Sequence, residues 1–220
     1  TWTIQTAPFD FGMTDPEFSA PYASGEYSAL APGEFFHDLA RVPTRWKTPG
    51  WTDCTVFPDR KGFVDIAAIY RKADANAAPA ERLAWTVAVN NEEGYLWYSI
   101  KDTAVLPQTV FWMENGGRHG APWSGRNSCI GIEETCGFLA SGRTASVGGN
   151  AVNRRGVPTA VQLSSKEPTV IRTLQGVLPL ENTDISVIGL ETTEADDTSW
   201  QFLLADGTVL PLNAPVSCIQ

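Results

Sequence analysis

The chain has 220 residues, of which 43% are hydrophobic and 19% are charged, so it can bury a sizeable core and lacks the composition of a disordered segment. Sixteen Lys and Arg against 25 Asp and Glu give a net charge of −9, which repels the phosphates of nucleic acid and an anionic membrane surface. No apolar run approaches the roughly 20 residues that a spanning helix needs, so we expect neither nucleic acid nor a membrane as a partner.

The first 60 residues differ in character from the rest of the chain. Prolines interrupt every extended run there, and aromatic side chains are frequent. Proline favours extended or turn geometry over helix, and so much aromatic surface is unlike a flexible linker. This segment is predicted to form long ordered loops and short strands that cover one face of a sheet.

From residue 61 onward, short runs rich in β-branched and aromatic residues alternate with turn residues, which is typical of an all-β sandwich or barrel. Two turns favour hairpins, the Asn- and Gly-containing segment 90–94 and the pair Asp206-Gly207, because both accept left-handed turn positions. The predicted strands span 63–70, 83–89, 95–100, 109–113, 128–133, 159–163, 169–174, 185–190 and 200–204.

Together these elements predict one all-β domain, an antiparallel β-sandwich over residues 1–220. Residues 61–180 form its main sheets and residues 181–220 a C-terminal β extension. The chain begins at Thr1 without a Met, which leaves room for a removed leader or for strands upstream. Sheet edges left open by such missing strands would favour a homodimer.

The cysteines indicate the redox environment. None of the four forms a CxxC pair, and two histidines in the whole chain cannot complete an ordinary structural zinc site with them. We expect reduced core thiols, with disulfides as the alternative, no metal site and a cytoplasmic location. The four are Cys54, Cys129, Cys136 and Cys218.

Residue types that commonly act in catalysis or ligand binding are concentrated in segments 111–126 and 131–136. The first segment holds one of the two histidines, two arginines and two tryptophans among glycines that let the backbone approach a ligand closely. No phosphate-binding glycine motif and no GxSxG elbow is present, which argues against nucleotide binding and serine hydrolysis.

Strand alternation separates Glu133 from Ile130 and Ile132, which enter the core while Glu133 faces the other side. If that side lines a cleft with His119, the two form a general base and a general acid. Alternatively, Glu133 pairs with Arg118 or Arg126 to hold the loop, and His119 is a surface group.

The two tryptophans of segment 111–126 also allow two interpretations. Trp112 lies on a predicted strand and is interpreted as a core filler. Trp123 follows a proline in a glycine-rich loop, where its ring could stack on a sugar.

Several motifs of this region together resemble those of a known family. The pattern resembles the galactose mutarotase-like superfamily, especially its aldose 1-epimerase-related branch, over about residues 95–180, and segment 156–163 looks like the closing strands of that fold. The resemblance implies a supersandwich whose concave polar face binds a monosaccharide or sugar derivative. The motifs are Trp112, Asn115-Gly116-Gly117-Arg118-His119, Pro122-Trp123, Arg126 and Gly131-Ile132-Glu133.

In aldose 1-epimerases a glutamate takes the proton of the anomeric hydroxyl and a histidine protonates the ring oxygen, so that the ring opens, rotates about C1–C2 and closes on the other anomer. The resemblance implies Glu133 as the base, with Glu134 as a one-residue alternative, His119 as the acid, and no cofactor. The family's Asn-His-x-Tyr-Phe element is not found in this sequence. The implied substrate-binding residues are Arg118, Arg126, Asn115, Trp123 and Glu114.

Two functions are therefore expected, a mutarotase-like isomerase or a non-catalytic carbohydrate-binding module of the same fold. A carbohydrate hydrolase or lyase is a third, with Glu114 and Glu133 as the one carboxylate pair to consider. Arg118 and Arg126 suit a carboxylate or phosphate, which favours an acidic sugar. The same arginines could instead balance Glu114 and Glu133, and the net charge disfavours the steering of an anion.

Overall fold

The structure is a computed structural model that describes residues 1–16, 27–74, 76–193 and 199–219. It confirms the predicted all-β class, with antiparallel sheets and, in the described part of the chain, one short α-helix, α1 (Gly142–Val147). The chain divides into two compact units. Unit 1 comprises Thr1–Pro8, Ala73–Ala104 and Ser164–Gln220, and unit 2 comprises Phe9–Lys72 and Val105–Leu163.

The two units interleave along the chain, so neither follows the predicted segments 1–60, 61–180 and 181–220. The grouping of both units into one domain stays a prediction.

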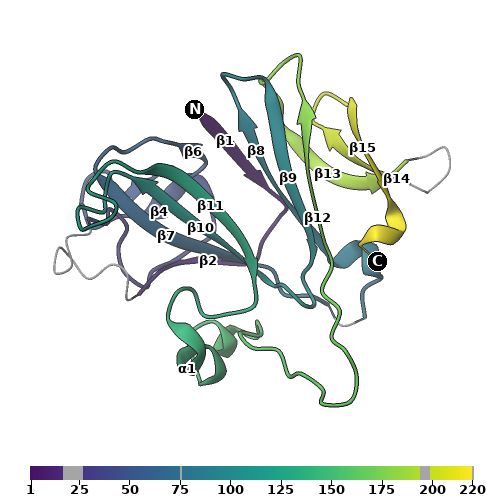
Figure 1. Ribbon diagram of the computed structural model, residues 1–220, viewed down its shortest axis with the longest axis horizontal. Coiled ribbons are helices and arrows are strands. Elements are labelled where there is room, and N and C mark those ends of the chain that lie inside the picture. The colour runs from purple at the N-terminus through teal and green to yellow at the C-terminus, as the bar shows by residue number, and fades with distance from the viewer. Residues whose placement is uncertain (17–26, 75, 194–198, 220) are drawn as a thin grey trace. The chain divides into compact units, whose positions relative to one another are not determined.

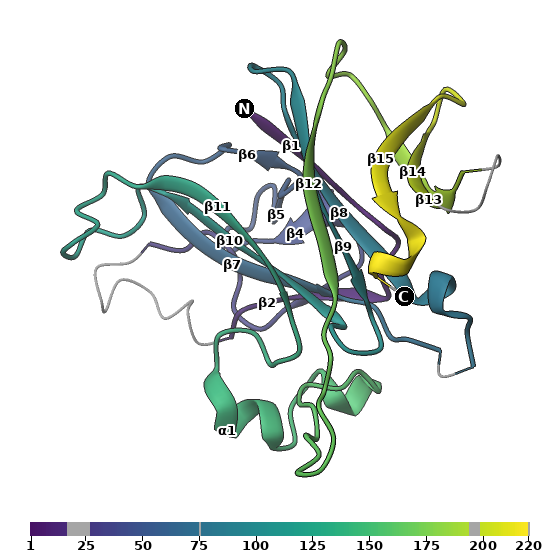
Figure 2. The ribbon, with the colours of Figure 1, turned by 45° about the vertical axis from the view of Figure 1, so that its right-hand side comes forward.

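Unit 1 is an antiparallel β-sandwich (Figure 1). One sheet contains β1 (Trp2–Thr6), β8 (Leu83–Asn90), β9 (Tyr95–Asp102) and β12 (Thr173–Pro179) in the order β12-β9-β8-β1. The second sheet has the order β13-β14-β15 and lies beside the first in both views (Figure 2). Its strands are β13 (Val187–Thr192), β14 (Ser199–Leu204) and β15 (Val209–Pro215).

Aromatic side chains fill the space between these two sheets. The ring of Phe202 lies 5.8 Å from that of Trp85 and 5.7 Å from that of Tyr98, both edge to face, a favoured aromatic geometry. Both predicted hairpins are confirmed, because β8–β9 and β14–β15 pair directly. Their turn glycines have positive φ, 69° at Gly94 and 85° at Gly207, as such turns require.

Unit 2 is built on a sheet with the order β11-β10-β7-β2-β3. Three of its strands come from the predicted runs, β7 (Phe63–Tyr70), β10 (Gln108–Asn115) and β11 (Ser128–Thr135). β2 (Phe11–Thr14) and β3 (Phe35–Phe36), from the proline-rich first part, complete this sheet. β4 (Val42–Pro43) and β5 (Trp51–Thr52) form a separate two-stranded sheet, and β6 (Val56–Phe57) is a further short strand of this part of the chain. Short 3-10 helices occur at Leu39–Arg41, Pro79–Arg82, Asn153–Arg155 and Val216–Cys218.

Two strand predictions are wrong. Residues 159–163 form no strand, and the strand predicted at 169–174 is β12, which begins only at Thr173. Residues 160–172 are exposed and no strand pairs with them. β-branched residues favour a strand mainly when neighbouring strands pack against them, and this segment has no such neighbour.

The loops before β7 are anchored by a buried carboxylate on that strand, Asp65. It is 1% exposed and accepts hydrogen bonds from the Ser28 hydroxyl at 2.8 Å and from the N–H groups of Ala29 and Leu30 at 2.9 and 3.0 Å. Arg60 adds a charged contact, with Nη2 at 3.4 Å from Asp65 Oδ2. The described part of the first 60 residues is therefore ordered loop and short strand, as predicted.

All four cysteines are free thiols, but only Cys54 is buried, so the prediction of core thiols holds for that residue alone. Burial raises the pKa of Cys54 to about 12. Among the residues that the structure describes, no helix is long and apolar enough to cross a membrane.

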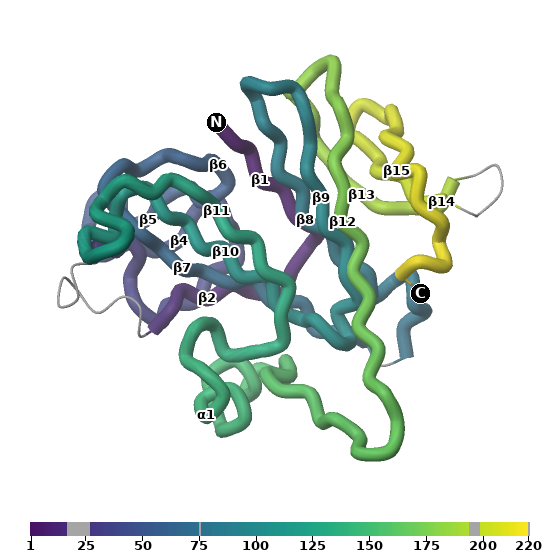
Figure 3. The backbone as a smooth tube through the Cα atoms, in the orientation of Figure 1, coloured from purple at the N-terminus to yellow at the C-terminus, as the bar shows by residue number. Residues whose placement is uncertain are grey.

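One face of the unit 2 sheet carries the site. In register, Val110 of β10 lies between Ala68 of β7 and Glu133 of β11, and Trp112 lies between Ile66 and Gly131. The segment after β11, which includes α1, covers part of this face with Phe138, Leu139, Ala151, Val152 and Val157. Figure 3 follows that segment along the chain. A pocket lies on this face, over β7, β10 and β11.

Candidate functional site

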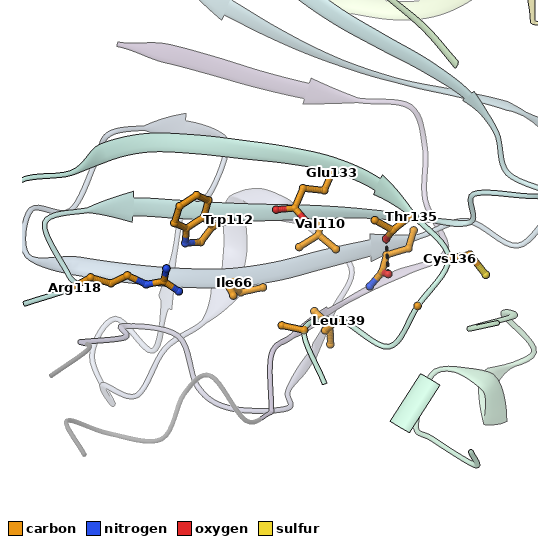
Figure 4. A pocket seen from close by; sticks show the side chains of 11 residues that line it. Ile66, Val110, Trp112, Arg118, Glu133, Thr135, Cys136 and Leu139 are labelled. Atoms are coloured by element: carbon orange, nitrogen blue, oxygen red, sulfur yellow. Dashed lines mark hydrogen bonds between the residues drawn. The ribbon is translucent and has the colours of Figure 1, made fainter. Parts of the chain in front are cut away.

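The pocket has a volume of about 450 Å³, a size that suits a small organic molecule. Its floor is apolar and consists of Ile66, Val110 and Trp112. Glu133 and Thr135 project from β11 at one side (Figure 4). The rest of the lining consists of Gln108, Arg118, Cys136, Gly137, Leu139 and Ala140.

Glu133 is the one carboxylate among the described residues that line the pocket. Its side chain is exposed, and no described residue forms a hydrogen bond or an ion pair with it. Gly131 lies on the same face, where a Cβ would be 3.4 Å from Glu133 Oε1, an ordinary contact, and 3.3 Å from the indole of Trp112. Glu134, the sequence alternative, is not a lining residue and accepts a hydrogen bond from Thr109 Oγ1 at 2.8 Å.

The guanidinium of Arg118 lies over two indoles, those of Trp112 and Trp123. The guanidinium carbon of Arg118 is 5.2 Å from the ring centre of Trp112 and 5.5 Å from that of Trp123, within the range of a cation–π contact. The two indoles meet edge to face at 6.0 Å. Trp112 thus packs against the core, as a core filler does, and also lines the pocket, with Arg118 and Glu133 on either side of it (Figure 4).

The loop that carries Arg118 is fixed by Glu114, at the end of β10. Glu114 is fully buried, and its Oε1 accepts hydrogen bonds from the N–H groups of Gly117 at 2.8 Å and Arg118 at 3.2 Å. Its Oε2 lies 3.9 Å from Arg118 Nε. Glu114 therefore determines both the path of the loop and the position of the guanidinium.

Gly117 is the point where this loop passes closest to β7. A Cβ at Gly117 would overlap the backbone of Phe63 and Val64, whereas a Cβ at Gly120 in the same loop would meet nothing within 4 Å. Backbone atoms cannot move aside as a flexible side chain can, so the loop itself must shift.

We expect Gly117→Ala to lower the free energy of unfolding by about 1–3 kcal/mol, the usual cost of overpacking. Gly120→Ala, the matched control, leaves it unchanged within about 0.5 kcal/mol. Urea unfolding followed by tryptophan fluorescence measures both variants. Equal stability of the two would show that the tight approach at Gly117 does not hold the loop.

The side chain of Gln108 holds the Thr135 end of the pocket together. Its buried side-chain amide lies 2.8 Å from the Tyr70 hydroxyl and 2.7 Å from the Thr135 hydroxyl, and 3.2 Å from both the Gly137 carbonyl and the Leu139 N–H. The orientation that uses all four partners directs the amide nitrogen toward Thr135 and Gly137. Gln108 thereby ties the 136–140 segment to the sheet.

The thiol of Cys136 also lines the pocket, and burial raises its pKa above the ordinary value. The thiol therefore stays protonated near neutral pH, and only the thiolate is a strong nucleophile.

The structure brings some of the predicted site residues together and separates others. Glu133 and Arg118 line the pocket, while Trp123 and Glu114 contact Arg118. The other three lie at the end of β10 or in the connection that follows it and are not lining residues. They are His119, which is exposed with its ring 4.5 Å from that of Tyr27; Asn115, whose Nδ2 donates to the Arg60 carbonyl at 2.8 Å; and Arg126, which is exposed.

Sequence reasoning missed Gln108, Thr135 and the 136–140 segment as parts of the site. A signal existed for the first two, because Gln108 and Thr135 share the face of Val110 and Glu133 by simple alternation. Among the residues described, no group of three or more His, Cys, Asp or Glu could hold a metal ion.

Comparison of the chain with protein families, curated proteins and solved structures found no match. The resemblance to the mutarotase-like superfamily stays a prediction. A functional conclusion must therefore rest on the chemistry of the pocket.

Proposed function

We propose that the chain binds a monosaccharide or sugar derivative in this pocket and interconverts its anomers, as a mutarotase-like isomerase, with Glu133 as the base. The observation that carries the proposal is the carboxylate of Glu133, which stands in a pocket of about 450 Å³ beside an indole and is engaged by no described residue. A base must be accessible and unpaired to accept a proton.

The lining supports a sugar ring as the ligand. A pyranose has a face of C–H groups and an edge of hydroxyls, and the pocket offers an apolar floor of Ile66, Val110 and Trp112 with polar groups at its sides. Small-molecule sites commonly combine such a floor with a few polar groups that fix orientation.

In the proposed reaction Glu133 accepts the proton of the anomeric hydroxyl, and the bond between C1 and the ring oxygen breaks. The ring oxygen takes up a proton, which the resemblance assigns to His119. Rotation about C1–C2 and the reverse steps then yield the other anomer, and the proton returns from Glu133. No atom is gained or lost, so the reaction requires no redox cofactor.

A second candidate is the non-catalytic carbohydrate-binding module of the same fold. The position of His119 favours it, because this side chain is exposed in the loop and is not a lining residue of the pocket. A pocket with one carboxylate and no acid would bind a sugar without opening its ring. The homodimer and the cytoplasmic location stay predictions under both candidates.

Anomer exchange measured by NMR on the purified chain tests the proposal. The panel contains aldoses, deoxy sugars and uronic acids. Exchange above the spontaneous rate supports the isomerase, whereas line broadening without exchange supports the binding module. If no sugar shows either effect, both candidates are wrong.

Both candidates require Trp112 as part of the binding surface. We expect Trp112→Ala to weaken sugar binding by about 10- to 100-fold, since truncating a tryptophan at the centre of a contact costs about 2 kcal/mol or more. Trp51→Ala is the matched control, because Trp51 is an exposed tryptophan of unit 2 outside the pocket. Titration calorimetry measures both, at temperatures where each variant is folded. Equal affinities would place the ligand elsewhere.

A further inference from the structure

Whether the pocket favours an anionic or an uncharged ligand depends on one arginine and on the charged groups around it. Arg118 is the one basic side chain among the described residues that line the pocket. An arginine in that position would by itself favour a carboxylate or a phosphate, which its guanidinium binds in a bidentate manner.

Glu114 changes this expectation. Its side chain is 0% exposed, and Oε2 accepts no hydrogen bond among the described residues, so Arg118 Nε at 3.9 Å is its closest compensating charge. A buried carboxylate without a compensating charge is costly. The positive charge of Arg118 therefore balances Glu114, and its guanidinium carbon lies over the rings of Trp112 and Trp123.

The remaining charges around the pocket are mostly negative. Glu133 lines it, and Asp15, which is 1% exposed, accepts a hydrogen bond at 3.2 Å from the N–H of the lining residue Ala140. Arg155, a further cation near this face, lies over Phe35 with its guanidinium carbon 3.8 Å from the ring centre. An anionic ligand would thus meet the carboxylate of Glu133, with the buried carboxylates of Glu114 and Asp15 close to the lining, and one arginine that Glu114 already balances.

We propose that the pocket takes an uncharged sugar in preference to an acidic one, and that Glu114 sets this preference by neutralising Arg118. This inference rests on the proposed function, since it specifies the substrate class of the same pocket. Glu114 acts through Arg118 and is a positioning residue rather than a catalytic one.

Glu114→Gln separates the charge of Glu114 from its structural role. The Gln oxygen can still accept the two backbone hydrogen bonds that Oε1 accepts from Gly117 and Arg118, while the negative charge beside Arg118 is removed. Glu93→Gln is the matched control, because it removes the same charge at an exposed turn of unit 1.

The experiment measures the affinities of three neutral aldoses and their uronates, glucose, galactose and mannose with the corresponding uronic acids, by NMR titration at pH 7. In the unmodified chain we expect each uronate to bind at least about tenfold more weakly than its aldose. Glu114→Gln should reduce that ratio by about tenfold, and Glu93→Gln should leave it unchanged. A purely structural role of Glu114 would weaken both ligands equally and leave the ratio constant.

A uronate that binds the unmodified chain as tightly as its aldose overturns this inference and leaves the proposed function standing. Failure of every sugar to bind overturns the proposed function as well.

If Glu114→Gln does not fold, the ionic strength is varied instead, and the same affinities are measured with the unmodified chain. Raising the ionic strength screens charges and should narrow the gap between aldose and uronate in the unmodified chain, and an unchanged gap would contradict the proposal.

Discussion

We expect Glu133→Gln to lower the proposed rate of anomer exchange by about 10²- to 10⁴-fold, the usual contribution of a positioned acid or base. The amide has nearly the shape of the carboxylate but cannot accept the proton of the anomeric hydroxyl. No described residue hydrogen-bonds or ion-pairs with Glu133, so folding stability should be unaffected. NMR exchange rates at saturating sugar, together with a thermal unfolding curve, measure the two effects.

Glu134→Gln is the matched control for this prediction. Glu134 is the next residue on the same strand but faces away from the pocket, where it accepts a hydrogen bond from Thr109, and a Gln oxygen can still accept that bond. Activity retained in Glu133→Gln and lost in Glu134→Gln would show that the other glutamate is the base. Activity retained in both variants would mean that neither is.

Asp65→Ala is expected to lower the free energy of unfolding by about 3–5 kcal/mol, the effect of breaking a buried charged network. The substitution leaves the Ser28 hydroxyl, two backbone N–H groups and the guanidinium of Arg60 without their shared acceptor. Each buried donor without an acceptor costs about 1–3 kcal/mol. The loop 28–30 should then detach from β7.

The control for Asp65→Ala is Asp38→Ala. Asp38 is exposed and accepts one backbone hydrogen bond, from Ala40 N at 2.9 Å, so its loss should cost about 1 kcal/mol. Urea unfolding gives both values, and the slope of the transition shows whether the exposed surface changes. Equal destabilisation by the two substitutions would mean that the Asp65 network does not anchor the loops.

Much of the fold could be predicted from local patterns. The strand 63–70 matches β7 at both ends, and the turns at 90–94 and 206–207 connect the strands they were expected to connect. Alternation along 128–133 predicted that Glu133 faces away from the side of Ile130 and Ile132, but the prediction that these two enter the core is wrong, because both are only partly buried while Val110, on the face of Glu133, is a core residue. These properties depend on neighbours one to four residues apart, where the period of a strand and the φ preferences of Asn and Gly act directly.

Tertiary structure decided what surrounds Glu133. Trp112 was interpreted as a core filler, but its indole both packs against the core and lines the pocket. The strand predicted at 159–163 does not form, because no other strand pairs with it. Both outcomes depend on which segments pack together, and a local pattern does not contain that information.

The sequence by itself determined the all-β class, most strands of the sheets and the face to which Glu133 belongs, because each follows from short-range periodicity and turn chemistry. Only the tertiary structure decided that Gln108 ties the 136–140 segment to the sheet, that Asp65 holds residues 28–30, and that Glu114 is buried where Arg118 must balance it. Hydrogen bonds and charge compensation act between atoms that the folded backbone brings together, whatever their separation along the chain.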